Sequence, residues 1–371
     1  MPRPIARIDL SAFRRNVDLV RHQLPTHCGV MAVVKADAYG HGVEAVSRAA
    51  QDMGIDRLGA ATVEEGKAIR DAGVALPVLL LDPILPRELP AALSADLELS
   101  IDTLEAARAA SEAARALGGA ARVHVDVDLG MRRFGVLPER LRSLLAEVAA
   151  LPSLRIEGVF GHLPRADSDR PEDEEETRAA IASLSAALCD LDRRGVLPPL
   201  RHIGNSAAVI HYPDKVASSP FNLVRIGTLF YGYPEVRRPW TAHVRPIATL
   251  TAQVIALKEV AEGEWVGYGR TWRAPSRRRV AVLAIGYADG LPPALGNRGS
   301  VALCGKRALF VGRVCLDHAL VDVTEIDGVR VGDTAEVLGP NLPADEAAAA
   351  GGLAVCELLV PALRGAERTH A

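Results

Sequence analysis

Five polar residues with chemically useful side chains each follow an apolar, strand-like run of the sequence: Lys35, Arg133, His162, Asn205 and Arg225. The carboxyl ends of parallel strands converge on one face of a barrel of alternating strands and helices, so we expect these side chains to share one site. Lys35 directly follows an apolar run. Burial there would lower the lysine pKa and favour the neutral amine that forms Schiff bases.

The residues after Lys35 favour a catalytic role for this lysine over a surface one. They read Lys-Ala-Asp-Ala-Tyr-Gly-His-Gly, with Tyr39 four positions along the chain. If the chain turns into a helix here, both side chains reach the same site. Gly40 and Gly42 allow the backbone to approach closely at that turn.

The elements that must position these residues alternate short β-branched runs with alanine- and leucine-rich helical stretches, which is typical of βα units. The predicted strands are residues 30–34, 57–61, 77–81, 97–101, 122–127, 156–161, 201–204 and 222–226. Helices are expected over 103–117, with Asp102 as N-cap, and over 174–194. The acidic stretch 172–176 is expected to form the first turn of the second helix rather than a cation site. This pattern predicts an α/β fold with an N-terminal (β/α)8 TIM-like barrel, while an open doubly wound sheet stays an alternative.

The alternation of strand-like and helical stretches ends at about Trp240. Residues 247–260, 279–285, 300–303, 319–323 and 334–338 are rich in β-formers and separated by glycine turns. We therefore expect a C-terminal all-β domain over 239–371, following a barrel domain over 1–238. The strand-like run 5–10 is a candidate to pair with the β domain.

Composition excludes several classes of protein. The 371 residues carry a formal net charge of -3, which indicates neither a nucleic-acid nor a membrane partner. No apolar run approaches the roughly 20 residues that span a bilayer, and the N-terminus lacks the apolar core of a secretory signal. The five cysteines are scattered without a C-x-x-C pair. We therefore expect a cytoplasmic protein with no disulfide framework and no metal site.

The sequence around Lys35 resembles the cofactor-lysine motif of the alanine racemase family, which uses pyridoxal 5'-phosphate. Further motifs of that family follow in order: Val127-Asp-Leu-Gly-Met-Arg-Arg-Phe-Gly135, Gly158-Val-Phe-Gly-His162, Gly204-Asn-Ser-Ala207, Val224-Arg-Ile-Gly227, Gly267-Tyr-Gly269, Ile285-Gly-Tyr-Ala-Asp-Gly290 and Val311-Gly-Arg-Val-Cys-Leu-Asp317. Together they span nearly the whole chain. The resemblance implies interconversion of L- and D-alanine by a homodimer with shared active sites.

The resemblance also implies roles for individual residues. Lys35 would hold the cofactor, and Arg225 would face its pyridine nitrogen and disfavour transamination. Proton transfer on two faces of the substrate would fall to Lys35 and to Tyr268 of the second subunit. The remaining assignments are Tyr39, Ser206, Gly227 and Thr228 at the phosphate, His162 and Asn205 beside the cofactor, Arg133 at the substrate carboxylate, Tyr287 and the Leu316 amide at the entrance, and Asp317 as a supporting residue.

Two positions depart from the family pattern. Asp126 stands where many members carry a carbamylated lysine, and its carboxylate would pair with Arg133 instead. Cys356 aligns with a tyrosine that lies close to the substrate methyl group. A smaller side chain there would open room near the β-carbon, so serine or a broader set of amino acids is an alternative substrate.

Two other classes of pyridoxal-phosphate protein share parts of this expected architecture. Pyridoxal-phosphate decarboxylases combine a similar barrel and β domain, but they place a carboxylate at the pyridine nitrogen, where this chain has Arg225. Non-catalytic pyridoxal-phosphate carriers resemble the barrel alone. The β domain and Tyr268 speak against them.

Overall fold

The computed structural model describes residues 3–371, which form two compact units. The barrel unit comprises residues 13–36 and 43–245. The β unit comprises residues 3–12, 37–42 and 246–371. The short segment 37–42, directly after Lys35 and Ala36, thus folds with the β unit.

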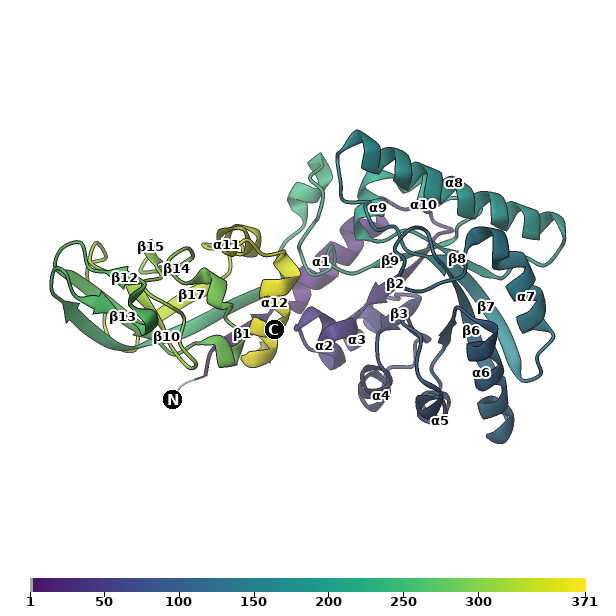
Figure 1. Cartoon of the computed structure of the whole chain (residues 1–371), viewed down its shortest axis with the longest axis horizontal. Coiled ribbons are helices and arrows are strands. Elements are labelled where there is room, and N and C mark those ends of the chain that lie inside the picture. The colour runs from purple at the N-terminus through teal and green to yellow at the C-terminus, as the bar shows by residue number, and fades with distance from the viewer. Residues whose placement is uncertain (1–2) are drawn as a thin grey trace. The chain divides into compact units, whose positions relative to one another are not determined.

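The barrel unit contains an eight-stranded parallel sheet in the order β4-β3-β2-β9-β8-β7-β6-β5 (Figure 1). Its strands are β2 (Gly29–Val33), β3 (Arg57–Ala60), β4 (Val78–Leu80), β5 (Leu99–Ile101), β6 (Ala121–Val127), β7 (Leu154–Gly161), β8 (Leu200–His202) and β9 (Leu223–Ile226). The outer strands β4 and β5 are joined by a parallel bridge between Leu79 and Glu98. The amide of Leu80 donates to the Glu98 carbonyl at 2.9 Å, and the Glu98 amide donates to the Val78 carbonyl at 2.8 Å. The sheet therefore closes, which confirms the barrel and removes the open-sheet alternative.

One helix precedes the first barrel strand, and the others lie between the barrel strands along the chain. They are α1 (Leu10–Arg21), α3 (Val43–Asp52), α4 (Val63–Asp71), α5 (Leu89–Ser94), α6 (Leu104–Ala116), α7 (Leu141–Ala149), α8 (Pro171–Arg193), α9 (Ser206–His211) and α10 (Pro213–Val216). Figure 1 shows α4 to α8 along the outside of the strands. The apolar residues of such helices face the sheet, as the buried Ala107, Ala110 and Ala114 of α6 do.

Two helix starts differ from the sequence predictions. The prediction of Asp102 as N-cap of α6 is wrong, because Thr103 caps the helix and its side chain accepts from the Ala106 amide. Threonine in extended conformation satisfies an orphan amide as well as aspartate does. Helix α8 begins at Pro171, three residues before the predicted start at 174. Its first turn contains Glu172, Asp173 and Glu174, as expected for carboxylates at the positive end of a helix dipole.

The β unit is built on the long strand β10 (Ala248–Val260), which pairs antiparallel with β1 (Ile5–Ile8), β13 (Arg278–Leu283) and β17 (Thr334–Leu338). Strand β18 (Glu367–His370) runs parallel to β1 on its other side. The remaining strands are β11 (Trp265–Val266), β12 (Trp272–Arg273), β14 (Ser300–Leu303), β15 (Lys306–Leu309) and β16 (Ala319–Asp322). The predicted C-terminal all-β domain is confirmed as a separate unit built mostly of strands.

The β unit also contains two helices that the sequence prediction did not include, α11 (Ala344–Gly351) and α12 (Val355–Gly365). Helix α11 lies in the alanine-rich stretch, and alanine is the strongest helix former. Over residues 3–371 no single helix is long and apolar enough to cross a membrane. Helices α11 and α12 reach that length and hydropathy only when taken together, and the pair is bent by 107°.

The segment after β2 is a left-handed helical turn, α2 (Lys35–Tyr39). Four successive residues, Ala36 to Tyr39, have φ between 52° and 59°. For L-residues this conformation costs about 1–2 kcal/mol each, so neighbouring structure must impose it. Within the β unit, Arg368 forms an ion pair with Asp37 and donates to the Gly40 carbonyl at 3.1 Å.

Candidate active site

The structure brings the five candidate residues of the barrel unit to one end of the strands. Lys35 follows β2, Arg133 follows β6, His162 follows β7, Asn205 follows β8, and Arg225 lies near the end of β9. These strands are parallel, so the side chains share the carboxyl end of the barrel, where (β/α)8 enzymes place their active sites.

Arg225 is a buried cation in this site. It is 5% exposed, and burial lowers its pKa to about 10, which leaves it protonated at neutral pH. Its Nη1 donates to the carbonyl oxygen and to Nδ1 of His202, both at 3.0 Å, and its Nη2 donates to the Gly161 carbonyl at 2.8 Å. The guanidinium also lies 5.4 Å from the centre of the Phe160 ring. These contacts fix the orientation of the guanidinium plane.

His162 shows that the site is electropositive. Burial and the positive charges of Arg225, Arg133 and Lys35 together lower the pKa of His162 to about 3. The imidazole is therefore uncharged at neutral pH. A site in which three cations face one neutral histidine is suited to binding anionic groups.

Asp126 supplies a negative charge beside these cations. It lines a small pocket together with Arg133, Phe134 and His162. Burial raises the pKa of Asp126 to about 6, while the charges of Arg225 and Arg133 oppose that rise. Arg133 lies over the Phe134 ring at 5.4 Å, and no ion pair within 4.0 Å joins it to Asp126 in the part of the chain described. The direct pairing of the two stays a prediction.

The segments after β8 and β9 are joined by hydrogen bonds. The Gly227 amide donates to the buried Ser206 hydroxyl at 3.0 Å. Asn205 caps α9 by accepting from the Ala208 amide at 2.9 Å, and its own amide donates to the Leu163 carbonyl at 3.2 Å. Thr228, also buried, follows Gly227 directly. The result is a compact set of hydroxyl and amide donors of the kind that binds phosphate.

The candidate residues of the β unit lie at its surface. Tyr268 is 71% exposed and begins a 3-10 turn, Tyr268–Arg270. Gly267 and Gly269 on either side have φ of 74° and 73°. A β-carbon at Gly312 would lie 2.7 Å from the Val266 carbonyl oxygen, so the two segments can pack this closely only with glycine there.

Tyr287 and Leu316 lie together in the β unit. The Tyr287 amide donates to the Cys315 carbonyl at 3.0 Å, and the Ala288 amide donates to the Leu316 carbonyl at 2.9 Å. A β-carbon at Gly286 would lie 2.2 Å from the Leu316 carbonyl oxygen, so only glycine permits this approach. Tyr287 is 48% and Leu316 51% exposed, and Asp317 beside them is also exposed.

Tyr39 and Cys356 belong to two segments of the β unit that touch. Tyr39 ends α2, and Cys356 lies half-buried in α12. A β-carbon at Gly40 would lie 3.0 Å from the Val360 carbonyl oxygen and from Cβ of Leu363, both on α12. The end of α2 is thus packed against this helix.

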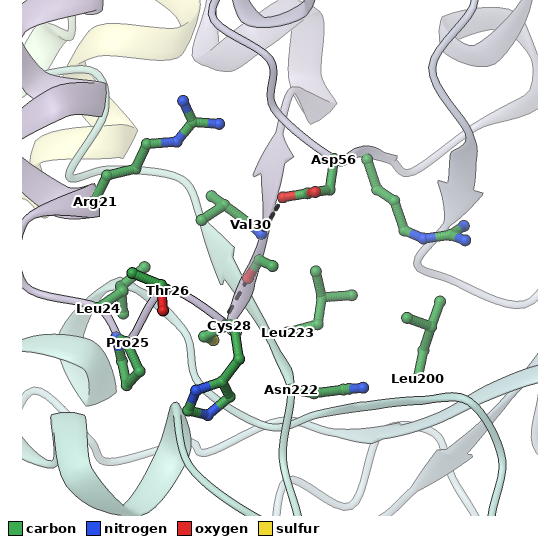
Figure 2. Close-up of a pocket in the computed structure, with 13 residues that line it drawn as sticks. Arg21, Leu24, Pro25, Thr26, Cys28, Val30, Asp56, Leu200, Asn222 and Leu223 are labelled. Carbon is green, nitrogen blue, oxygen red and sulfur yellow. Dashed lines mark hydrogen bonds between the residues drawn. The ribbon is translucent and has the colours of Figure 1, made fainter.

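A cavity of about 740 Å³ lies at the opposite end of the barrel, where the strands begin (Figure 2). Figure 2 shows Asp56 pointing to the start of β2, where its carboxylate accepts from the Val30 amide at 2.7 Å. Burial, together with the charge of Asp56, raises the pKa of the nearby Cys28 thiol to about 11. Cys28 is therefore a poor nucleophile.

Sequence reasoning missed two buried histidines behind Arg225. His124 and His202 are fully buried in the barrel, and their rings contact each other with centres 5.3 Å apart. Both lie inside short runs that were predicted as strands. A histidine within an otherwise apolar strand is the signal that could have drawn attention to them.

Comparison with known proteins agrees with this geometry. Family models match residues 8–235 as "Alanine racemase, N-terminal domain" and residues 247–369 as "Alanine racemase, C-terminal domain". An alanine racemase of Geobacter sulfurreducens is 37% identical over 337 residues, which cover 90% of this chain and 87% of the relative.

Solved structures agree as well. The alanine racemase of the D-cycloserine producer Streptomyces lavendulae is 33% identical with a TM-score of 0.90, covering 100% of this chain and 97% of that one. An alanine racemase of Bartonella henselae, solved with covalently bound pyridoxal phosphate, shares the fold at 22% identity and a TM-score of 0.87, with both chains covered to 100%. This chain belongs to the alanine racemase family.

Proposed function

We propose that this protein interconverts L-alanine and D-alanine with pyridoxal 5'-phosphate as cofactor, and so supplies D-alanine. The observation that carries the proposal is the electropositive end of the barrel, where Lys35 lies with Arg133 and Arg225 around the uncharged His162. The family membership of the whole chain supports the same conclusion.

The residues present fit this cofactor. The Ser206 hydroxyl and the adjoining Gly227 amide, with Thr228 and Asn205 beside them, suit its phosphate, to which Tyr39 would add a hydroxyl. Arg225 can only donate hydrogen bonds, so it suits an unprotonated pyridine nitrogen and would disfavour the protonated ring that transaminases and decarboxylases use. When bound, the cofactor withdraws electrons and acidifies the α-proton of the amino acid.

The side chains of this protein would then bind the substrate and move its proton. Arg133 would bind the alanine carboxylate, with the charge of Asp126 nearby holding the guanidinium in place. Lys35 would hold the cofactor and move the proton on one face. Tyr268 would move the proton on the other face, next to the positive charges of the barrel end.

We further propose that Tyr268 acts in the barrel of a second subunit. Tyr268, Tyr287 and Leu316 are exposed on the β unit, although each is assigned to the active site. Exposed residues with such roles are expected where a partner's site needs completing. The enzyme would be a homodimer with two shared sites, and Asp317 would support the segment that carries Leu316.

Two measurements test the cofactor and the reaction. Borohydride reduction of the cofactor-loaded protein should attach the cofactor irreversibly to the peptide containing Lys35, as detected by mass spectrometry. Chiral chromatography should show D-alanine formed from L-alanine by the wild type and none by Lys35→Ala. Attachment at another lysine, or no D-alanine from a loaded wild type, would refute the proposal.

Mixing two inactive variants tests the shared site. In a heterodimer of Lys35→Ala and Tyr268→Phe, one site combines the intact Lys35 of one chain with the intact Tyr268 of the other. Random pairing should therefore restore about one quarter of wild-type activity, since half of the dimers are mixed and each has one good site. If both residues acted within one chain, mixing would restore nothing.

We also place the enzyme in the cytoplasm. No disulfide joins the five cysteines within residues 3–371, and a reducing compartment suits such a protein. Fractionation of the source cells should recover the activity with cytoplasmic markers.

A further inference from the structure

A chain of four buried side chains runs through the barrel behind the active site. Arg225 Nη1 lies 3.0 Å from His202 Nδ1, His202 Nε2 lies 3.1 Å from His124 Nδ1, and His124 Nε2 lies 3.1 Å from a Glu98 oxygen. Both histidines are 0% exposed and Glu98 is 1% exposed. The proposed mechanism uses only the first of the four, Arg225.

The donors and acceptors of these four side chains fix the direction in which each hydrogen bond between them is donated. Arginine can only donate, so His202 Nδ1 must accept and His202 must carry its proton on Nε2. That proton is donated to His124 Nδ1, which places the proton of His124 on Nε2, facing Glu98. Glu98 can accept it because its carboxylate is ionised. Each hydrogen bond therefore fixes the tautomer of the next ring.

The charges agree with this assignment. Burial opposes ionisation of Glu98, but the hydrogen bond from His124 and the charge and hydrogen bonds of Arg57 outweigh it and lower the pKa of Glu98 to about 2. Burial lowers the pKa of His124 and of His202, so both rings are neutral. A protonated His202 would present a proton to Arg225 where an acceptor is needed.

Glu98 is itself anchored at the far end of the barrel. Both of its oxygens accept from Arg57 Nη1, at 2.6 and 2.7 Å, and Arg122 Nε lies 3.3 Å away. The carboxylate is thus held in place independently of the active site. His202 is also stacked on Phe160, with ring centres 5.1 Å apart and planes 6° from parallel. The chain connects a fixed carboxylate to Arg225 through rings that cannot rotate freely.

We propose that Glu98 and His124 are positioning residues for Arg225. The carboxylate sets the tautomers of both histidines, so that an acceptor always faces the guanidinium and directs its remaining N–H groups to the cofactor site. Without the carboxylate the tautomers can reverse, and His202 would then present an N–H to Arg225 and push it away. The expected effect on racemisation rests on the proposed function, whereas the tautomers do not depend on it.

The first test observes the tautomers directly. ¹⁵N NMR of the wild-type holoenzyme, labelled at histidine, should show His124 and His202 as neutral rings protonated at Nε2 at neutral pH. The two signals are assigned by their loss in His124→Leu and His202→Leu. A charged ring, or a proton on Nδ1 of either histidine, would overturn the proposal even if the Glu98 variants misfolded.

The second test compares two carboxylate-to-amide substitutions. Glu98→Gln keeps the shape of the side chain but adds an amide that can donate to His124. The direction of the hydrogen bonds from Glu98 to Arg225 can then reverse. Glu157→Gln is the matched control, because Glu157 is also buried in a barrel strand and its charge also acts on His124, but it pairs with Arg155 at 2.6 Å and is not one of the four hydrogen-bonded side chains. Outer partners of metal ligands typically contribute about 10-fold to 100-fold to activity, and we expect a fall in kcat on that scale for Glu98→Gln alone, with KM changed far less.

The absorbance spectrum of the bound cofactor gives a readout that needs no turnover. Glu98→Gln should shift that spectrum because the partner of the pyridine nitrogen moves, whereas Glu157→Gln should leave it unchanged. A folded Glu98→Gln protein with wild-type spectrum and kcat would refute the positioning role. If the wild type bound the cofactor but racemised nothing, the proposed function would fail, while the spectrum and the NMR would still decide on Glu98 and His124.

Discussion

The two units of the molecule hold their candidate site residues in opposite ways. In the barrel unit, Ser206 and Arg225 are buried and hydrogen-bonded to neighbouring strands and loops. In the β unit, Tyr268 and Leu316 are exposed, and glycines in or beside their segments allow close packing of the backbone. The candidate residues of the barrel unit are thus buried within their own fold, whereas those of the β unit lie at its surface.

This difference shows that a site residue can be constrained by folding, by activity, or by both. A buried residue contributes to folding as well as to chemistry, since its hydrogen bonds are part of the packed barrel. An exposed residue is kept for what it does to something outside its own unit. Substitutions in the two units should therefore change stability and activity in different proportions.

The largest effect expected is on activity, from Tyr268→Phe. Loss of a positioned proton-transfer group typically costs about 100-fold to 10,000-fold in rate. Stability should change by less than about 0.5 kcal/mol, because the tyrosine is exposed. Chiral assay of alanine and urea denaturation measure the two quantities.

Arg225→Leu is the counterpart in the barrel. It removes the donors to Gly161 and His202, each worth about 1–3 kcal/mol when a buried acceptor is left unsatisfied, so both activity and stability should fall. Equal losses of stability in the Tyr268 and Arg225 variants would contradict the contrast between the units.

The next effect concerns the left-handed turn after Lys35. Arg368→Ala removes the ion pair to Asp37 and the hydrogen bond to the Gly40 carbonyl, and should destabilise the protein by about 2 kcal/mol. Because the turn then relaxes, affinity for the cofactor should fall as well, as measured by fluorescence titration. Arg277→Ala, which removes an exposed ion pair with Glu259, should leave both quantities unchanged.

Sequence patterns predicted most of the barrel because its strands are apolar runs and its helices amphipathic. All eight predicted barrel strands overlap the observed ones. The left-handed turn at Ala36 to Tyr39 was not foreseeable from periodicity, since contacts with β18, more than 300 residues away in sequence, impose it. The histidine chain was missed for a related reason. Only folding brings Glu98, His124 and His202 from three separate segments into line.

The third effect is a pH dependence from Asp126. Its pKa is raised to about 6 by burial, so the carboxylate loses its charge as the pH falls through 6. Arg133 then loses its neighbouring negative charge, and KM for alanine should rise by about tenfold on the acid side. Asp126→Asn should show the high KM at every pH, whereas Glu157→Gln should keep the wild-type profile.

The sign for stability is opposite to that for binding. The folded-state pKa of Asp126 lies above the unfolded value of about 3.8, so protonation favours folding and the contribution is lost as pH rises through 6. Asp126→Asn should therefore be no less stable than the wild type at pH 7. A less stable variant would mean that the carboxylate is held by a pairing stronger than the structure shows.

The smallest effect concerns substrate choice and Cys356 on α12. A tyrosine at this half-buried position would fill space that the cysteine leaves, so Cys356→Tyr should raise the preference for alanine over serine. Apolar pockets reject an added hydroxyl weakly, and we expect a change of less than about tenfold in the ratio of kcat/KM values. Cys189→Tyr, at an exposed cysteine of α8, is the control for adding a tyrosine anywhere. An unchanged ratio in both variants would show that Cys356 does not face the substrate, and the alternative of serine as a substrate would lose its structural basis.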